Sequence, residues 1–297
     1  MVVTVKTNSR KYSKKSSTGA KEDATKRALE MLEKGVSSVF NDENYKSYLS
    51  TMAKFYNYSF GNCFLIKAQC PQASYVAGFN SWKNNFKRTV KKGEKGLMIL
   101  APNPYEKKVI EEDADGNEVE TVVKGLRFKT AYVFDISQTE GEPLPSICNS
   151  LTGDSDMYSK YIKSIKAVSP VPVRFEHIKG GAHGYYSHVE KVIAIEEQDS
   201  QIQQMKTATH ELAHSLLHNK ENGEQAQADR RTKEVQAESV AYVVCNHFGI
   251  DTSSYSFEYI ATWSAGKEIK ELKASLDIIQ KTAKSIIDGL TKQLATA

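Results

Sequence analysis

The stretch 206-KTATHELAHSLLHNK-220 contains His210, Glu211 and His214 in the pattern H-E-x-x-H. On a helix, positions i and i+4 lie on one face, so the two imidazoles can converge on a single metal ion. Glu211 then lies beside them, an arrangement typical of a zinc site with a glutamate as general base. Leucines at three other positions give the helix an apolar face, and the stretch therefore predicts a half-buried helix that binds a metal.

A third ligand is expected on a later helix, 234-EVQAESVAYVVCNHFG-249, where Glu234 and Glu238 lie one turn apart. We predict that Glu234 binds the metal and that Glu238 holds one imidazole in the right tautomer, although the reverse assignment stays open. The predicted cofactor is one Zn²⁺ per chain, with other divalent metals as alternatives. A fourth position is left for water, whose proton Glu211 would take and pass to a leaving amine.

Two other interpretations of this stretch stay open. The helix can carry two hydrogen-bonded histidines and no metal, or the site can bind zinc without cleaving anything. His218 lies one turn beyond His214, too far along the helix to share the metal, and is expected to pack or to lie at the surface. The segment 184-GYYSHVEKVIAIE-196 precedes the helix and predicts the edge strand on which a peptidase of this kind aligns its substrate.

The composition indicates a globular protein. The chain has 297 residues, 40% hydrophobic and 26% charged, which suits one large domain or two ordinary ones. No apolar run approaches the ~20 residues of a membrane span, so no membrane association is expected. The first residues lack the apolar segment of a secretory signal, which predicts a cytoplasmic protein. Four cysteines without a C-x-x-C pair favour free, buried thiols.

The two halves of the chain differ in charge. Residues 1–140 carry 23 lysines and arginines against 16 acidic residues, a net charge of +7, whereas residues 141–297 carry 17 against 20, a net charge of −3. We predict an α+β fold with a disordered basic tail over 1–24 and two domains, 25–145 and 146–297. The Pro-containing segment GEPLPS (141–146) is the expected linker.

Local patterns predict the elements of the first half. A helix is expected from about residue 24 with Gly35 as its C-cap, followed by helices over 42–56 and up to Pro71. Strands are expected at 97–102 and 128–137, with a hairpin between them that turns at Asp115–Gly116. In the second half, a helix near 154–167 and two strands precede the H-E-x-x-H helix, and two helices are expected within 255–293.

The segment from 81 to 96 is basic and aromatic. It contains six lysines and arginines against one acid, with Trp82 and Phe86 among them. Basic side chains neutralise phosphates and aromatic faces stack on unpaired bases, so the segment favours single-stranded nucleic acid. The alternative is that the aromatic residues belong to the core and that the lysines form a solvated face.

Several separated motifs give the chain a resemblance to ArdC-type antirestriction proteins of conjugative plasmids and mobile elements. The matching segments are 58-YSFGNCFLI-66, 78-GFNSW-82, 90-VKKGEKGLMILAP-102, 132-YVFDISQTEGEPLP-145, 184-GYYSHVEKVIAI-195, 210-HELAH-214, 234-EVQAESVAYVV-244 and 259-YIATW-263.

This resemblance implies a single-stranded-DNA-binding domain followed by a zincin-like metallopeptidase domain, in a protein that protects transferred DNA from host restriction. It also implies DNA contacts at five residues of the first half: Asn62, Trp82, Lys91, Lys92 and Lys95. The second half is similar to the ImmA/IrrE type as well, which leaves open a regulatory zinc peptidase that cleaves a repressor. A third alternative is a non-catalytic DNA-binding module that zinc stabilises.

Overall fold

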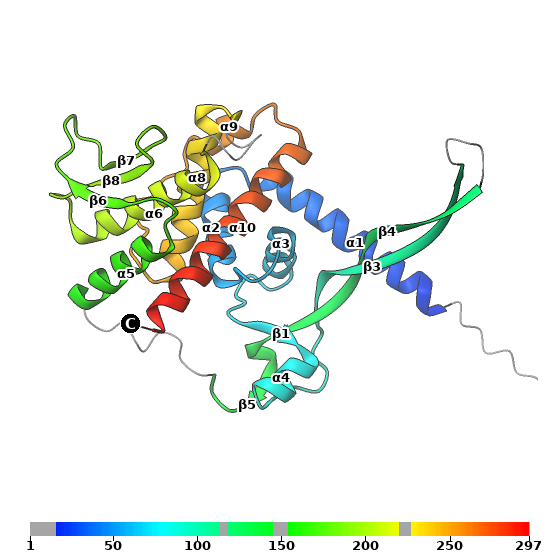
Figure 1. Ribbon diagram of the computed structural model, residues 1–297. Helices are drawn as coiled ribbons and strands as arrows, with labels where there is room; N and C mark the ends of the chain where they lie inside the picture. Colours follow the sequence, from blue (N-terminus) through cyan, green and yellow to red (C-terminus); the bar gives the residue numbers. More distant parts are fainter. Residues whose placement is uncertain (1–15, 113–117, 145–153, 220–226, 297) are drawn as a thin grey trace, which may run out of the picture.

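The computed structural model describes residues 16–112, 118–144, 154–219 and 227–296 (Figure 1). The helices of the first half are α1 (Ser16–Ser38), α2 (Asp42–Lys54), α3 (Phe60–Gln69) and α4 (Phe79–Asn85). Its strands are β1 (Val76–Gly78), β2 (Arg88–Val90), β3 (Leu97–Glu112), β4 (Glu118–Asp135) and β5 (Thr139–Gly141), with a 3-10 turn over Ile136–Gln138.

The second half contains a small sheet and a group of helices. Its elements are α5 (Asp154–Val168), β6 (Val173–Glu176), β7 (Gly184–Ser187), β8 (Val192–Glu196), α6 (Gln201–Leu217), α8 (Arg230–His247), α9 (Ile260–Ser264) and α10 (Ile269–Leu294). The mixture of helices and strands confirms the predicted α+β class. In the described ranges, no helix is both long enough and apolar enough to cross a membrane.

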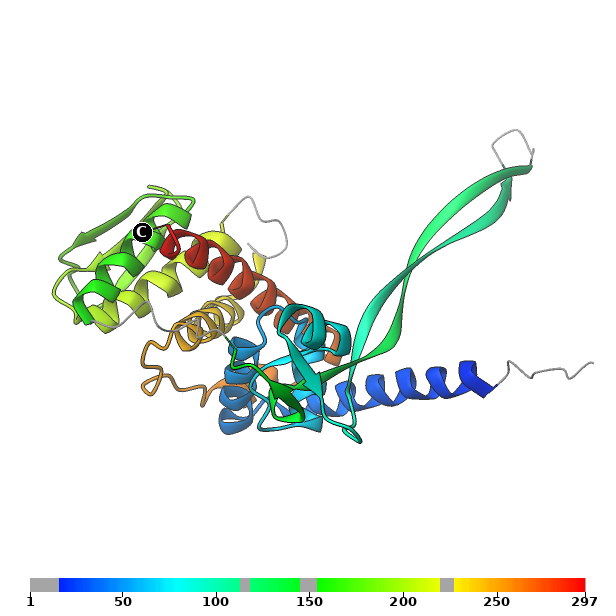
Figure 2. The same ribbon diagram turned by 90° about the horizontal axis from the view of Figure 1, so that it is seen from below.

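Strands β3 and β4 form one long antiparallel ribbon that projects away from the body (Figure 2). Their pairing is unbroken, so the strands predicted at 97–102 and 128–137 are the body ends of longer strands. Pro102 and Pro104 are tolerated inside β3 because β3 is the edge strand in the order β1-β4-β3. The turn predicted at Asp115–Gly116 lies outside the described residues.

Helix α1 is longer than predicted at both ends. It begins at Ser16, inside the tail predicted to be disordered over 1–24, and it continues past Gly35, which was predicted to end it. The residues before position 24 include alanine, lysine and glutamate, good helix formers that extend an existing helix without a new nucleus. Gly35 serves packing instead, because a Cβ there would lie 2.9 Å from a ring carbon of Phe64 in α3. Residues 1–15 lie outside the described part of the chain.

One hydrophobic core joins the two halves. Buried side chains of α2, α3, α8 and α10 belong to a single cluster, and α10 crosses the middle of the molecule in Figure 1. Two hydroxyl pairs connect α2 to α8: Tyr45 Oη lies 2.8 Å from Ser239 Oγ, and Ser50 Oγ lies 2.8 Å from Tyr242 Oη. Helix α8 is therefore packed against the first half of the chain. The predicted boundary between residues 145 and 146 falls where the structure is not described, over 145–153.

The sheet of the second half has three strands where the sequence predicted two. The segment 184–196 folds back on itself, so β7 runs antiparallel to β8 and forms an edge of the order β6-β8-β7. All five residues of β8 are buried, as expected for a central strand that packs on α6. Of the segment 184–196, which was predicted as one edge strand, only β7 lies at the edge, because β8 is the central strand.

Asp135 ties the end of β4 to the chain that enters β1. Its carboxylate accepts hydrogen bonds from the backbone N–H groups of Ser74 (2.8 Å), Tyr75 (3.2 Å) and Ser137 (2.9 Å), and from the Ser137 hydroxyl (2.7 Å). Burial opposes the charged form, but these four bonds outweigh it and hold the pKa of Asp135 below its usual range.

We expect Asp135→Asn to lower the free energy of unfolding by about 1–3 kcal/mol at neutral pH, because bonds to a charged acceptor are lost. The folded carboxylate binds protons less readily than the unfolded one. Its contribution is therefore complete above the unfolded pKa of ~3.9 and is lost as the pH falls through the lower folded value. Urea denaturation should show the gap between variant and wild type narrowing from pH 7 to pH 3. The exposed Glu140→Gln is the control, and a gap that stays constant with pH would contradict the assignment.

Candidate metal centre

The residues of the predicted metal site lie where α6 packs on α8. The N-cap of helix α6 is Ser200, whose side chain accepts a hydrogen bond from the backbone N–H of Gln203. Its inner face is fully buried at Ala208, Leu212 and Ala213, and this packing fixes the rotation of α6 about its own axis. The two histidines of the H-E-x-x-H pattern project from the neighbouring face, toward α8.

Three nitrogen and oxygen atoms converge between these helices. His210 Nε2 and His214 Nε2 are 3.0 Å apart, and Glu234 Oε2 lies 3.5 Å from the first and 3.6 Å from the second. The three residues form a group that could hold a metal ion. A metal bound at ~2.0–2.1 Å with tetrahedral angles places its donor atoms about 3.3 Å apart. The triangle therefore fits one ion of that size, with a coordination position left over.

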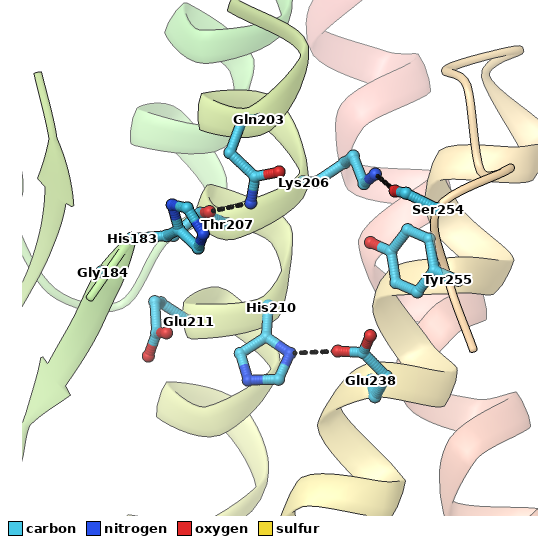
Figure 3. Close-up of a pocket in the computed structure, with 10 residues that line it drawn as sticks. All are labelled: His183, Gly184, Gln203, Lys206, Thr207, His210, Glu211, Glu238, Ser254 and Tyr255. Carbon is cyan, nitrogen blue, oxygen red and sulfur yellow. Dashed lines mark hydrogen bonds and ion pairs between the residues drawn. The ribbon is translucent and has the colours of Figure 1, made fainter. Parts of the chain in front are cut away.

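Glu238 bonds the opposite side of the His210 ring. Its Oε2 lies 3.0 Å from His210 Nδ1 (Figure 3). An imidazole that donates from Nδ1 carries its lone pair on Nε2, which here points at the triangle. The geometry thus favours Glu234 over Glu238 as the third donor, a choice that the sequence left open.

The electrostatics of the triangle favour a cation at its centre. Burial lowers the pKa of His210, but the carboxylates of Glu234 and Glu238 outweigh it and raise that pKa to about 10. Hydrogen bonds from His210 and His214 hold the pKa of Glu234 well below its usual range. Three electron-pair donors this close repel one another unless a proton or a metal ion lies between them.

Glu211 lies between α6 and the edge strand β7 (Figure 3). Burial raises its pKa, and the charges of His210 and His214 and a backbone hydrogen bond at Tyr186 oppose this only in part. The close approach of β7 depends on Gly184. A Cβ at this position would lie 2.9 Å from the carbonyl oxygen of Ala194 and would overlap the methyl group of Thr207.

Two clefts meet at Glu211. One, of about 420 Å³, is lined by His183, Lys206 and Tyr255, and the other, of about 590 Å³, by Tyr186, His188 and Arg230. Both clefts also include three shared residues: Gly184, His210 and Glu211. Together the two clefts form a groove along β7 and past the triangle.

His218 is buried, which agrees with the prediction that it packs and excludes a surface position. No pattern in the sequence indicated its partners. His218 Nδ1 lies 2.9 Å from His214 Nδ1, and its Nε2 lies 3.0 Å from Gln236 Oε1. It is therefore on the side of His214 that faces away from the triangle.

The structure contradicts two of the five predicted DNA contacts. Trp82 is fully buried and donates from Nε1 to the carbonyl oxygen of Phe134 at 2.9 Å. Asn62 is 8% exposed, and its amide pairs with both backbone groups of Leu100 at 2.9 and 3.0 Å, as a neighbouring strand would. The prediction is wrong for both residues because core packing uses their side chains completely.

The three predicted lysines lie on the loop between β2 and β3 and are exposed. Lys91 donates to the carbonyl oxygen of Ser137 at 2.9 Å, which orders the loop. The side chains of Lys92 and Lys95 extend from the same loop. The structure thus leaves these positions accessible to a polyanion.

The ribbon offers a second accessible surface, which the sequence analysis missed. Side chains along a strand alternate between its two faces, so the even-numbered residues of β4 share one face of the ribbon. Along that face Leu126, Phe128 and Tyr132 are each more than half exposed. Exposed Arg127 and Lys129 point to the other face. The pattern that could have indicated this surface is the alternation of large apolar residues with basic residues along β4.

Comparison with known proteins identifies two domains. Residues 19–134 match the N-terminal domain of anti-restriction factor ArdC, and residues 169–248 match the IrrE N-terminal-like domain of the M78 peptidases. An uncharacterized protein of Bacillus anthracis is 28% identical over 96% of this chain, and the chain spans only 54% of the length of that relative.

Two solved structures are also similar. Both are crystal structures of the antirestriction protein ArdC from plasmid R388, one metal-free and one with Mn(II) bound. They are 20% and 18% identical, with TM-scores of 0.47 and 0.46, and each alignment covers 80% of this chain and 84% of the other.

The packing of β7 on α6 leads to a prediction at Gly184. We expect Gly184→Ala to push the edge strand away from Glu211 and to lower the melting temperature by several degrees, because a backbone carbonyl must move. Gly78→Ala is the matched control, since nothing lies within 4 Å of the added methyl group there. Thermal unfolding followed by circular dichroism measures both. Equal melting temperatures for the two variants would show that β7 does not need this close approach.

Proposed function

Because the chain is of the ArdC type, with an IrrE N-terminal-like domain behind its ArdC N-terminal domain, we propose that it is an antirestriction protein that binds single-stranded DNA and carries a zinc peptidase-type site. It would act in the cytoplasm on DNA that enters by conjugation and protect that DNA from restriction. The observation that carries the peptidase part is the convergence of His210, His214 and Glu234 beside Glu211, under an edge strand.

Zinc is the metal that best suits two imidazoles and one carboxylate with an open position. When bound, it would polarise a carbonyl group and acidify a water molecule. His210 and His214 would supply their Nε2 atoms, and Glu234 would supply Oε2. Glu238 would keep His210 in the tautomer that leaves Nε2 unprotonated.

Glu211 is suited to move a proton. Its carboxylate is buried next to the groove, and this burial raises its pKa, which favours a group that accepts a proton and later releases it. We expect it to accept the proton of the attacking water and to deliver it to the leaving amine.

The edge of β7 would hold the substrate. Among the described strands β7 pairs only with β8, so the backbone groups of its other edge can pair with an extended peptide. A peptide aligned there would pass over Glu211 and the triangle. This favours a protein substrate over a small molecule.

The DNA-binding surface would combine the loop lysines with the ribbon. Phe128 and Tyr132 offer exposed rings on which unpaired bases can stack. The ribbon is only two strands wide, so Arg127 and Lys129 on its other face can reach phosphates at either edge. Stacking requires unpaired bases, which favours single strands over duplex.

We expect Glu234→Gln to lose bound zinc and Glu238→Gln to bind it about 10–100-fold more weakly, because the first removes a ligand and the second only an orienting partner. Metal content after desalting and chelator competition measure both. The exposed Glu258→Gln should bind like wild type. The opposite order of the two variants would exchange the roles of the two glutamates. Wild-type protein without metal affinity would rule out the zinc site.

Glu211→Gln tests whether the site cleaves. It should bind zinc and melt like wild type, yet lose hydrolysis of an unfolded protein such as casein. Protection of conjugated DNA in a restricting host should be measured with the same variant. Loss of protection with unchanged DNA affinity would favour the alternative, a regulatory peptidase that acts on a repressor. Undiminished casein hydrolysis would contradict the role of Glu211.

DNA binding is tested by fluorescence anisotropy with labelled single-stranded and duplex oligonucleotides at several salt concentrations. Wild type should prefer single strands. The pairs Arg127→Glu with Lys129→Glu, and Lys92→Glu with Lys95→Glu, should weaken binding and reduce the salt slope by about 0.7 for each phosphate that is no longer neutralised. The control pair, Lys270→Glu with Lys292→Glu on α10, changes the net charge equally and should leave affinity unchanged. Equal weakening by all three pairs would reduce the effect to net charge, and absence of binding by wild type would overturn the DNA part of the proposal.

A further inference from the structure

A chain of buried polar side chains leads away from the triangle into the core. His214 Nδ1 lies 2.9 Å from His218 Nδ1, His218 Nε2 lies 3.0 Å from Gln236 Oε1, and Gln236 Nε2 lies 3.4 Å from Ser275 Oγ. His218 and Gln236 are each 2% exposed and Ser275 is 6% exposed. This series of side chains connects the end of α6 to α8, and α8 to α10.

Every hydrogen bond in this series of side chains is donated in the same direction, away from the triangle. An amide oxygen only accepts, so His218 Nε2 must donate to Gln236 Oε1. A neutral His218 then has its lone pair on Nδ1, which can only accept. The partner at 2.9 Å, His214 Nδ1, must therefore donate. This leaves His214 Nε2 without a proton, and that atom is the one in the triangle.

We propose that His218 is a positioning residue that fixes His214 in the tautomer and ring orientation needed for a metal. Gln236 in turn fixes which ring nitrogen of His218 donates and which accepts. This role depends on the metal centre of the proposed function. It accounts for the last histidine of 210-HELAHSLLH-218, which the metal triangle does not use.

The spacing explains why His218 acts on His214 and not on the metal. It lies one turn beyond His214 on the same face, and its backbone N–H still donates to the carbonyl oxygen of His214 at 2.8 Å. From there its ring reaches the outer nitrogen of His214 and no further. The same one-turn step that brings His210 and His214 together thus places the third imidazole behind the second.

The two imidazoles of the triangle consequently have partners of different charge. His210 donates to the carboxylate of Glu238, whereas His214 donates to a neutral ring. A carboxylate behind each histidine would put three negative groups, with Glu234, around one divalent ion. The neutral partner fixes the tautomer without adding negative charge, which keeps the centre more electrophilic.

The test uses the full chain and measures the affinity for Zn²⁺ by chelator competition, with the absorption spectrum of the Co²⁺ form as a second readout. We expect His218→Leu to weaken zinc binding about 10–100-fold and to change the Co²⁺ spectrum, because His214 loses its acceptor. His218→Gln should restore most of the affinity, since its amide can accept from His214 and donate to Gln236. Gln236→Leu removes the acceptor of His218 Nε2, and its zinc affinity should lie between those of His218→Leu and His218→Gln.

His247→Leu is the matched control. His247 is a partly buried histidine near the end of a helix, and its Nδ1 donates to the carbonyl oxygen of Ala53 at 3.1 Å, but it lies away from the triangle. The substitution should lower the melting temperature of the metal-free protein and leave zinc affinity unchanged. If His218→Leu fails to fold, His218→Gln and Gln236→Leu decide the question.

The possible outcomes separate this inference from the proposed function. Zinc affinity within twofold of wild type in His218→Leu and Gln236→Leu, with reduced melting temperatures, would make His218 a packing residue and overturn the inference while the metal site stands. No zinc affinity in wild type would instead overturn the metal site itself.

Discussion

The candidate metal centre depends on three electron-pair donors held within 3.6 Å of one another. Such a group is unfavourable without a cation, and among the described residues it occurs at this one place. Three nearby features hold the donors in position. Glu238 and His218 occupy the outer nitrogens of the two imidazoles, and the packing of α6 on α8 brings Glu234 to them.

Periodicity predicted this centre better than it predicted the rest of the chain. The one-turn spacings of His210 with His214 and of Glu234 with Glu238 are properties of a helix, so they could be derived without a fold. Which glutamate faces the triangle depends on the rotation of α8 about its axis. That rotation is set by contacts with α2 and α10 that no local pattern reveals.

The errors in the first half have the same origin. Aromatic and amide side chains in a basic segment suit DNA binding and core packing equally well, and burial decides between these roles only in three dimensions. Trp82 and Asn62 both close hydrogen bonds to strand β4 or β3 and are hidden by doing so. The hairpin was predicted, but its length was not, because the strands expected at 97–102 and 128–137 are only the body ends of β3 and β4, and an edge strand tolerates Pro102 and Pro104. Gly35 was misplaced because its role is close packing against Phe64 and not a helix end.

Helix α8 has two different partners on its two faces, and this links the halves of the molecule. One face carries Glu234 and Glu238, and the other bonds α2 through Ser239 and Tyr242. A metal that binds only the folded state adds stability in proportion to the logarithm of its concentration over its dissociation constant. Because the core is continuous, that stability is shared with the helices that support the ribbon. The helices that support the ribbon and the helices of the candidate metal site therefore share one hydrophobic core. Loss of the proposed metal would therefore destabilise the same core that supports the ribbon.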